Sequence, residues 1–365
     1  MWKGSDLFRL RDPARAERLA HALRRFAPEK PVKIVHVCGT HEAAIAEHGL
    51  RSLLPEGVEV YEGPGCPVCV TSTADINLAV ALALEEGAIV CTFGDMLRVP
   101  GTELTLEEAR AQGADVRVVL SAADAVRVAR ENPRQEVVFF AVGFETTAPG
   151  TAAVLLDGPP GNFSVLCSHK LIPPALEALL RENTEVDGFL APGHVSTIIG
   201  ADAYRELAER FHVPVVVGGF EPLDVLFAIA LILRQLAEDR AEVDNAYPRA
   251  VRPEGNVRAK RIMGEVFRVV DAVWRGIGAI PASGLELGAE FTRYNAREKF
   301  GLETGTGDEE PPGCRCPDII MAKAVPTDCP LFGAACTPLS PVGPCMVGVE
   351  GACSIWYRYG ERPRL

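Results

Sequence analysis

The chain of 365 residues has a formal net charge of -12 and is 48% hydrophobic and 24% charged, a composition that suits a globular protein of two or three domains. The excess of acidic residues argues against nucleic-acid binding, which depends on clustered Lys and Arg. Because the chain has 11 cysteines and no recognisable signal peptide, we expect a cytoplasmic protein whose thiols serve metal or redox chemistry.

The residues up to about Ala27 have the periodicity of a helix, which ends at a Pro-Glu-Lys-Pro break. From Val32 onward, short β-branched runs alternate with helical segments, a rhythm typical of parallel sheets with crossover helices. The runs are VKIVHV, VEVY, AIVCTF and VRVVL, and then EVVFFAV, FSVLCS, VDGFLA and VPVVVGG. This pattern predicts two Rossmann-like α/β units, the first over 31–132 and the second over 133–245.

Two longer helices are predicted next, over 221–242 and 254–276. The longest apolar run, 225–233, is too short to span a bilayer, so we expect no membrane segment. Segment 301–344 is poor in large apolar residues, so burial alone should not hold it together and a cross-link, which its cysteines could supply, should be needed for it to fold. The fold class is therefore predicted to be α/β, with two parallel-sheet units and a smaller, mostly helical or irregular cysteine-rich domain formed by 1–30 and 246–365.

Six cysteines lie near the C-terminus, and we expect four of them to hold a 4Fe-4S cluster. Zinc sites usually pair cysteines in close knuckles or add histidines, but these cysteines are spread over Pro-rich loops and no histidine follows His212. A zinc site or unliganded buried thiols remain the alternatives. The predicted cluster ligands are Cys329, Cys336, Cys345 and Cys353, which leaves Cys314 and Cys316 as a neighbouring redox pair or as substitutes.

The GPGCPVC stretch carries Cys66 and Cys69 in a Cys-x-x-Cys spacing directly after a predicted strand. A first thiol at a helix N-terminus has a lowered pKa, and such a pair can interconvert between dithiol and disulfide. Half of a zinc site has the same spacing, but no second pair of matching spacing lies nearby. We therefore predict a redox dithiol.

The HVCGTHE stretch places Cys38 at the end of the first strand and His41 and Glu42 at the start of the next helix. A thiolate at a helix N-terminus, with a histidine one turn on and a carboxylate to orient it, suits a soft iron or thiol chemistry. Alternatively, Cys38 is a small buried residue that ends the strand. Gly39 and Thr40 are predicted to form the turn and N-cap that expose the thiol.

Polar residues also follow the strands of the second unit, at the sheet edge where open α/β proteins bind ligands. They are Glu145, Thr146, Thr147, His169, Lys170, His194 and Glu221. We therefore expect both units to turn their reactive edges toward a common target, with one shared cleft as the candidate arrangement. Asp95 and Arg98 are predicted to form an ion pair, Cys91 and Cys167 are predicted to be buried strand thiols, and no nucleotide-binding motif is present.

The motifs CGTHE, GPGCPVC, GFETTAP, DGFLAPGHVSTIIG, GFEPLDVL and CPLFGAACTPLSPVGPCMVGVEGAC together resemble the HypD family of NiFe-hydrogenase maturation proteins, from about Val32 to the C-terminus. The resemblance implies an assembly factor that, with a HypC-type small chaperone, carries the iron on which the Fe(CN)2CO group is built. A HypE-type cyanide donor and, indirectly, the hydrogenase large subunit are the other implied partners. The resemblance also implies that Cys38 binds the iron with His41 close by. It implies further that Cys66 and Cys69 are the redox dithiol and that the C-terminal cysteines hold a 4Fe-4S cluster.

Our hypothesis is a scaffold with redox activity, in which electrons pass from the cluster to the dithiol and serve ligand assembly at an iron held by Cys38 and a cysteine of the partner. Glu145, Thr146 and His194 would hydrogen-bond cyanide nitrogens or move protons. The first alternative is an iron-sulfur thiol-disulfide oxidoreductase that acts on a client protein. The second is an α/β binding protein with a structural zinc.

Overall fold

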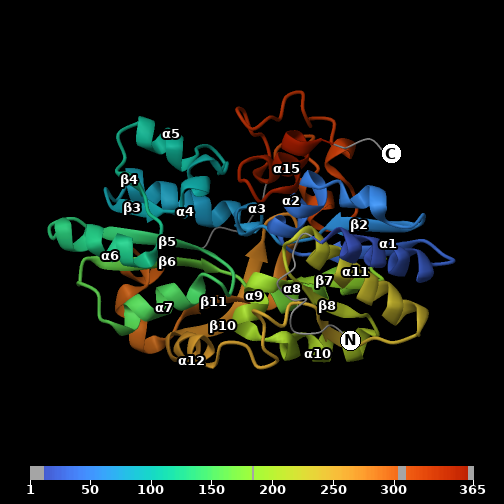
Figure 1. The fold of residues 1–365 in the computed structure, drawn as a ribbon. Helices are drawn as coiled ribbons and strands as arrows, with labels where there is room; N and C mark the ends of the chain where they lie inside the picture. The colour runs from blue at the N-terminus through green and yellow to red at the C-terminus, as the bar shows by residue number, and fades with distance from the viewer. Residues whose placement is uncertain (1–11, 183–184, 303–309, 361–365) are drawn as a thin grey trace.

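The computed structural model describes residues 12–182, 185–302 and 310–360, and it contains two parallel sheets, one antiparallel hairpin and a C-terminal lobe (Figure 1). Sheet A has five strands in the order β2-β1-β7-β8-β9. They are β1 (Val32–His36), β2 (Val58–Glu62), β7 (Gly188–Pro192), β8 (Val215–Gly218) and β9 (Val243–Asn245). Strands β1, β7 and β8 are almost entirely buried, which is usual for parallel strands covered on both faces.

Sheet B has four parallel strands in the order β4-β3-β5-β6. They are β3 (Ile89–Thr92), β4 (Val116–Val118), β5 (Val137–Gly143) and β6 (Phe163–His169). Every β-branched run that was predicted as a strand contains one. The predicted α/β class with parallel sheets is therefore confirmed.

The two sheets do not follow the order of the chain, because each draws strands from both predicted ranges, 31–132 and 133–245. Strand β1 pairs with β2 on one side and with β7 on the other, with Ile34 opposite Gly188 and His36 opposite Leu190. The chain therefore leaves sheet A after β2, builds sheet B, and returns at β7. The alternation of elements indicates that parallel sheets form, but it does not say which strands are neighbours.

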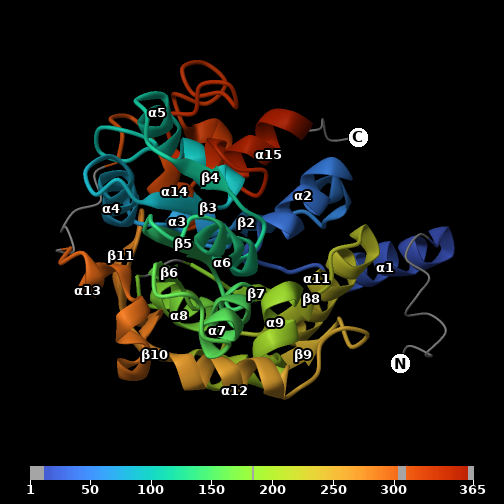
Figure 2. The same cartoon turned by 90° about the vertical axis from the view of Figure 1, so that its left-hand side faces the viewer.

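Helices cover both faces of each sheet (Figure 2). One face of sheet A packs against α1 (Pro13–Arg25), α2 (Gly39–Glu47) and α11 (Pro222–Ala237), and the other against α8 (Ile172–Arg181) and α10 (Arg205–Phe211). Sheet B packs against α4 (Thr73–Leu84) and α5 (Leu106–Ala111) on one face and α6 (Ala122–Glu131) and α7 (Ala148–Leu156) on the other. The shorter elements are α3 (Pro67–Val70), α9 (Gly193–Ile199), α13 (Ala296–Lys299) and the 3-10 helices η2 (Leu50–Leu53), η3 (Gly94–Arg98), η4 (Ala201–Tyr204) and η5 (Ala289–Tyr294).

The helix predicted over 254–276 is wrong in its second half. Helix α12 (Val257–Val266) stops at Phe267, whose backbone is extended, and the chain continues as β10 (Phe267–Trp274). This strand pairs in antiparallel fashion with β11 (Gly278–Leu287). The β-branched and aromatic residues of FRVVDAVW favour the strand, because such side chains pack well on a pleated surface.

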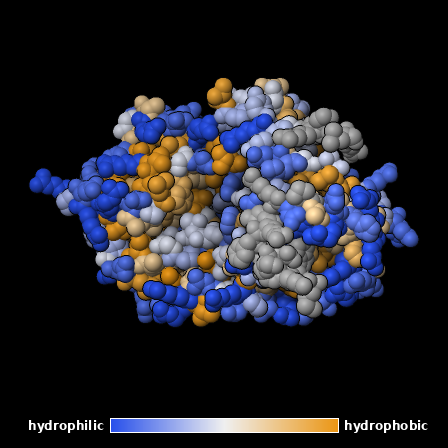
Figure 3. Space-filling view, in the orientation of Figure 1, coloured by the Kyte–Doolittle hydropathy of each residue, from blue (hydrophilic) through white to orange (hydrophobic). Residues whose placement is uncertain are grey.

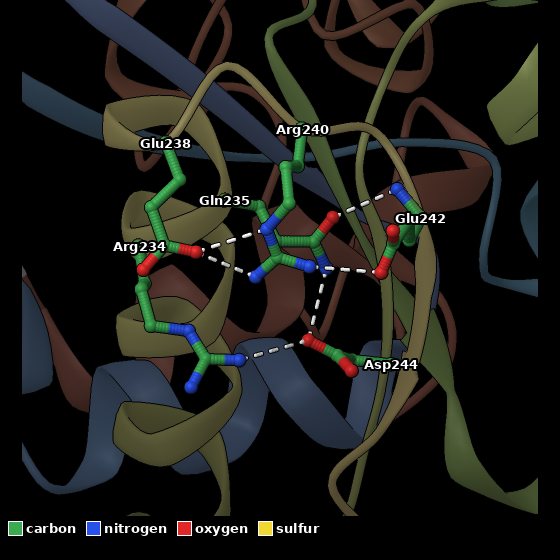
Figure 4. Close-up of polar contacts among 6 residues, drawn as sticks. All are labelled: Arg234, Gln235, Glu238, Arg240, Glu242 and Asp244. Atoms are coloured by element: carbon green, nitrogen blue, oxygen red, sulfur yellow. Dashed lines mark hydrogen bonds and ion pairs between the residues drawn. The ribbon is translucent and has the colours of Figure 1, made fainter.

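Helix α11 also ends earlier than its predicted range of 221–242 (Figure 4). The Gln235 side chain accepts a hydrogen bond from the backbone N–H of Glu242 and donates one to Asp244. Arg240 bonds the carboxylates of Glu238 and Glu242. These contacts fold the chain back so that it continues into β9, which was not among the predicted strands.

The C-terminal lobe contains α14 (Cys316–Ile320), η6 (Pro326–Asp328), η7 (Pro344–Met346) and α15 (Ala352–Tyr359), joined by loops. It lies over α2 and α3, as both ribbon views show. Its Cys316, Cys336, Cys345 and Cys353 belong to the same buried cluster as apolar residues of β1, β7 and β8. The lobe therefore shares a hydrophobic core with sheet A.

The face of the molecule in Figure 3 is mostly hydrophilic, with apolar residues gathered in separate patches. Among the described residues, the helices are too short or too polar to cross a lipid bilayer.

Candidate functional site

Cys38 lies two residues beyond β1, at the carboxyl edge of sheet A, where it is the N-cap residue of α2. The prediction that Gly39 and Thr40 form the cap and expose the thiol is wrong, because Cys38 is only 9% exposed. Burial, together with the charge of Glu350, raises the pKa of the thiol to about 11. The backbone N–H groups of Thr40 and His41 and the Thr40 hydroxyl act in the opposite direction. These groups would favour a thiolate once a cation replaces the proton.

Glu42 does not orient His41, as the sequence suggested, but is the centre of a buried polar cluster. Its carboxylate bonds His36 Nε2 at 2.6 Å and the guanidinium of Arg51 at 2.8 and 2.9 Å. The indole N–H of Trp356 in α15 donates to it at 2.7 Å. Burial acts to raise the pKa of Glu42, but Arg51 and His36 outweigh it and hold the pKa at about 2. Glu42 therefore joins β1, α2, η2 and the C-terminal lobe.

The loop that carries Gly65, Cys66 and Cys69, called the dithiol loop below, packs directly against the backbone of Cys38. A Cβ on Gly65 would lie 2.1 Å from the nitrogen of Cys38, so only glycine fits there. Cys66 and Cys69 form a disulfide, and Cys66 Sγ accepts the backbone N–H of Cys69 at 3.1 Å. Cys69 Sγ lies 3.9 Å from the carbonyl oxygen of Pro344 in the C-terminal lobe. The dithiol thus lies between Cys38 and that lobe.

Glu62, the last residue of β2, was not among the predicted site residues. Its side chain lines a small cavity with Cys66, Cys69 and Cys345, and its Oε2 has no hydrogen-bond partner among the described residues. Burial, and then the charge of Glu42, raises the pKa of Glu62 well above its usual value. The signal in the sequence was a carboxylate two residues after Val60, on the same side of the strand as the buried Val58 and Val60.

We expect Glu62→Gln to be more stable than the parent chain above pH 5, with a gain that grows toward pH 8. A carboxyl whose pKa is raised by folding stabilises the fold below its unfolded pKa of about 4.5, and this contribution is lost as the pH rises through the folded value. Thermal unfolding of the parent, Glu62→Gln and Glu59→Gln, which alters an exposed position of the same strand, would measure the effect. A gain that does not change with pH would contradict it.

The predicted residues of sheet B lie at strand ends, but they differ in their surroundings. Glu145 is buried, with Oε1 accepting the N–H of Ile172 and Oε2 unpartnered among the described residues, and burial raises its pKa to about 7. Both the Glu145 and Cys38 charges act on the buried Tyr204, which the sequence analysis missed. Thr146 is exposed. Glu145 is therefore the member of this set that shares a neighbour, Tyr204, with Cys38.

His169 and Lys170 have structural contacts instead. His169 Nε2 lies 2.9 Å from the Thr151 hydroxyl, and Lys170 Nζ donates to the carbonyl of Val273 in β10. The predicted ion pair of Asp95 with Arg98 does not form, since Arg98 donates to the carbonyls of Pro338 and Val347. Cys91 and Cys167 are buried strand thiols, as predicted.

The C-terminal thiols lie near one another, and Cys314 and Cys316, which were not among the predicted cluster ligands, are part of this group. A Cβ on Gly343 would lie 2.5 Å from Cys314 Sγ and 2.7 Å from Cys316 Sγ. A hydrogen bond with Cys316, and then burial, raises the pKa of Cys345. Cys329 Sγ lies 4.0 Å from the carbonyl of Gly313. Within the described ranges no three His, Cys, Asp or Glu side chains are placed so as to hold a metal ion.

Fold and site together define a class of α/β protein in which a buried strand-end thiol, a Cys-x-x-Cys disulfide and a lobe with six cysteines meet at the edge of one sheet. The family model HypD, described as "Hydrogenase formation hypA family", matches residues 14–360. The chain belongs to this family of hydrogenase maturation factors.

Several curated relatives match nearly the whole chain. Hydrogenase maturation factor HypD2 of Bradyrhizobium diazoefficiens is 46% identical, over 98% of this chain and 97% of its own length. Hydrogenase maturation factor HypD of Azotobacter vinelandii is 44% identical, over 96% of each chain. The HypD of Escherichia coli (strain K12) is 43% identical, over 95% of this chain and 93% of its own.

Proposed function

We propose that this chain is the scaffold on which the Fe(CN)2CO group of NiFe hydrogenase is assembled, together with a HypC-type small chaperone. The observation that carries the proposal is the position of Cys38. Its sulfur lies at the N-terminus of α2 and close to hydrogen-bond donors, and Gly65 brings the dithiol loop against its backbone. A soft iron is the cargo that such a thiolate suits.

The residues around Cys38 have distinct parts in this proposal. Cys38 binds the iron and gives up its proton on doing so, because the thiolate is the metal ligand. Glu145, whose pKa of about 7 lets it exist in both forms near neutral pH, holds or accepts a proton. His194, which follows β7 of sheet A, and Thr146, which follows β5 of sheet B, are both exposed. They would contact the partner that contributes the second cysteine.

The C-terminal cysteines fit a 4Fe-4S cluster in kind and number, since six thiols are concentrated in one lobe and four of them suffice. Cys329, Cys336, Cys345 and Cys353 would hold it, with Cys314 and Cys316 as neighbours. The cluster supplies one-electron redox chemistry when bound. Cys69 lies against Pro344, the residue before Cys345, so the dithiol is next to the lobe that would receive the cluster. A HypE-type cyanide donor and, indirectly, the hydrogenase large subunit complete the proposed set of partners.

The second candidate is an iron-sulfur thiol-disulfide oxidoreductase that acts on a client protein. The disulfide between Cys66 and Cys69, adjacent to the cysteine-rich lobe, favours it. This function needs Cys66 and Cys69 but no iron at Cys38. Infrared spectroscopy distinguishes the two, because only the scaffold predicts bound cyanide and carbonyl groups.

The test is anaerobic co-purification of the chain with its small partner, followed by infrared spectroscopy. We expect cyanide and carbonyl bands in the parent complex, complete loss of them in Cys38→Ala, and their retention in Cys91→Ala, which alters a buried thiol of sheet B. Iron and sulfide analysis of each sample reports the cluster separately. Bands of full strength in Cys38→Ala would refute the scaffold role of Cys38.

A further inference from the structure

Three rings from three neighbouring strand ends of sheet A form a column next to Cys38. His41 follows β1, His194 follows β7 and Phe220 follows β8. The ring of Phe220 lies between the two histidines, with centroids 4.8 Å from His41 and 3.8 Å from His194, and with its plane inclined to theirs by 28° and 25°. The column runs from the exposed His194 to the fully buried His41.

The Phe220 loop also sets which nitrogen of His41 carries the proton. His41 Nε2 lies 3.0 Å from the carbonyl oxygen of Gly219, and because a carbonyl can only accept, Nε2 must donate. With the proton on Nε2, Nδ1 of the neutral ring carries a lone pair, and among the described residues this buried atom has no partner.

The loop formed by Gly219 and Phe220 packs against the side chains of Asp224 and Tyr247. A Cβ on Gly219 would lie 2.4 Å from Asp224 Oδ2, and Asp224 forms an ion pair with Arg249. Tyr247 meets the Phe220 ring edge-on, with centroids 5.9 Å apart. Asp224 and Tyr247 therefore pack against the loop that carries the carbonyl of Gly219 and the ring of Phe220.

We propose that Phe220 is a positioning residue that keeps His41 in one ring plane and one tautomer, so that Nδ1 offers a hydrogen-bond acceptor to a ligand bound next to Cys38. This inference rests on the proposed function of the Cys38 site and specifies its ligand chemistry. A thiol S–H, an ammonium or amide N–H, or a water molecule can donate to Nδ1. A cyanide nitrogen, which only accepts, must find its donors elsewhere.

The experiment uses the full chain labelled with 15N-histidine and long-range 1H–15N NMR, with the His41 signals assigned from a His41→Gln spectrum. We expect the parent to show a single Nε2–H tautomer at about pH 7. Phe220→Leu should lose this single-tautomer pattern, whereas Phe291→Leu, a half-buried phenylalanine in the core of sheet B, should keep it. If Phe220→Leu does not fold, Phe220→Met removes the ring with less change in volume.

A second readout is the rate at which iodoacetamide alkylates Cys38, followed by mass spectrometry. We expect at least a tenfold faster reaction in Phe220→Leu than in Phe291→Leu, because the first turn of α2 loses its support. An unchanged His41 spectrum together with an unchanged rate would overturn the proposal. Neither measurement needs iron, so this failure is distinct from failure of the scaffold function, which the infrared bands test.

Discussion

The Glu42→Ala variant is expected to lose about 3 kcal/mol of folding stability, because removing one partner of a buried ion pair leaves the others without compensation. The carboxylate is fully buried and receives hydrogen bonds from His36, Arg51 and Trp356. Its loss would leave the buried indole N–H unpaired and would separate the C-terminal lobe from α2. Urea unfolding, monitored by tryptophan fluorescence, would measure the change.

Glu47→Ala is the matched control, since Glu47 is exposed on the same helix and should change stability by no more than about 0.5 kcal/mol. The pH dependence is a second check with Glu42→Gln. Folding lowers the pKa of Glu42 to about 2, so its stabilisation is present above about pH 4.5 and is lost as the pH falls toward 2. The parent should therefore lose its advantage over Glu42→Gln between these values, and a constant difference would contradict the proposed origin.

The Gly65→Ala variant is expected to lose about 3 kcal/mol and to displace the dithiol loop from Cys38. The added Cβ would lie 2.1 Å from Cys38 N and from the carbonyl carbon of Val37, and these are backbone atoms that cannot rotate away. The loop or the end of β1 must shift. Thermal unfolding would report the destabilisation, and alkylation of Cys38 by iodoacetamide should be faster than in the parent.

Gly264→Ala is the matched control for this substitution. Gly264 lies inside α12 with open space around its Cβ position, so alanine should stabilise the helix by up to about 1 kcal/mol. Effects of opposite sign at Gly65 and Gly264 would show that the contact with Cys38 is responsible, and not the loss of a glycine as such. Equal effects at both positions would count against the contact.

Both predictions test the same property, which is that Cys38 is held by segments remote from it in sequence. Gly65 packs against its backbone, and a Cβ on Gly39 would lie 2.2 Å from the carbonyl oxygen of Glu350. Glu42, one turn into α2, accepts the indole N–H of Trp356. Any movement of the dithiol loop or of the C-terminal lobe must therefore displace the thiol or the first turn of its helix.

Much of the site could be predicted because its signals are local. A β-branched run followed by Cys-Gly-Thr-His-Glu places Cys38 where a parallel strand ends and a helix begins, whatever the neighbours are. The same reasoning placed Glu145 and His194 correctly at strand ends. It failed for residues 267–274, where FRVVDAVW fits a helical period but pairs with β11 instead.

The sequence by itself determined the α/β class, the strands β1 to β8, the strand-end position of Cys38 and the Cys-x-x-Cys pair, because periodicity, turn residues and cysteine spacing act over a few residues. Only the tertiary structure decided that β1 pairs with β7 and that Phe220 lies between two histidines. It also decided that Glu42 accepts hydrogen bonds from His36 and Arg51 and does not orient His41. These contacts join residues far apart in the chain. They depend on which buried surfaces and polar groups can satisfy one another in three dimensions, and no local pattern encodes that choice.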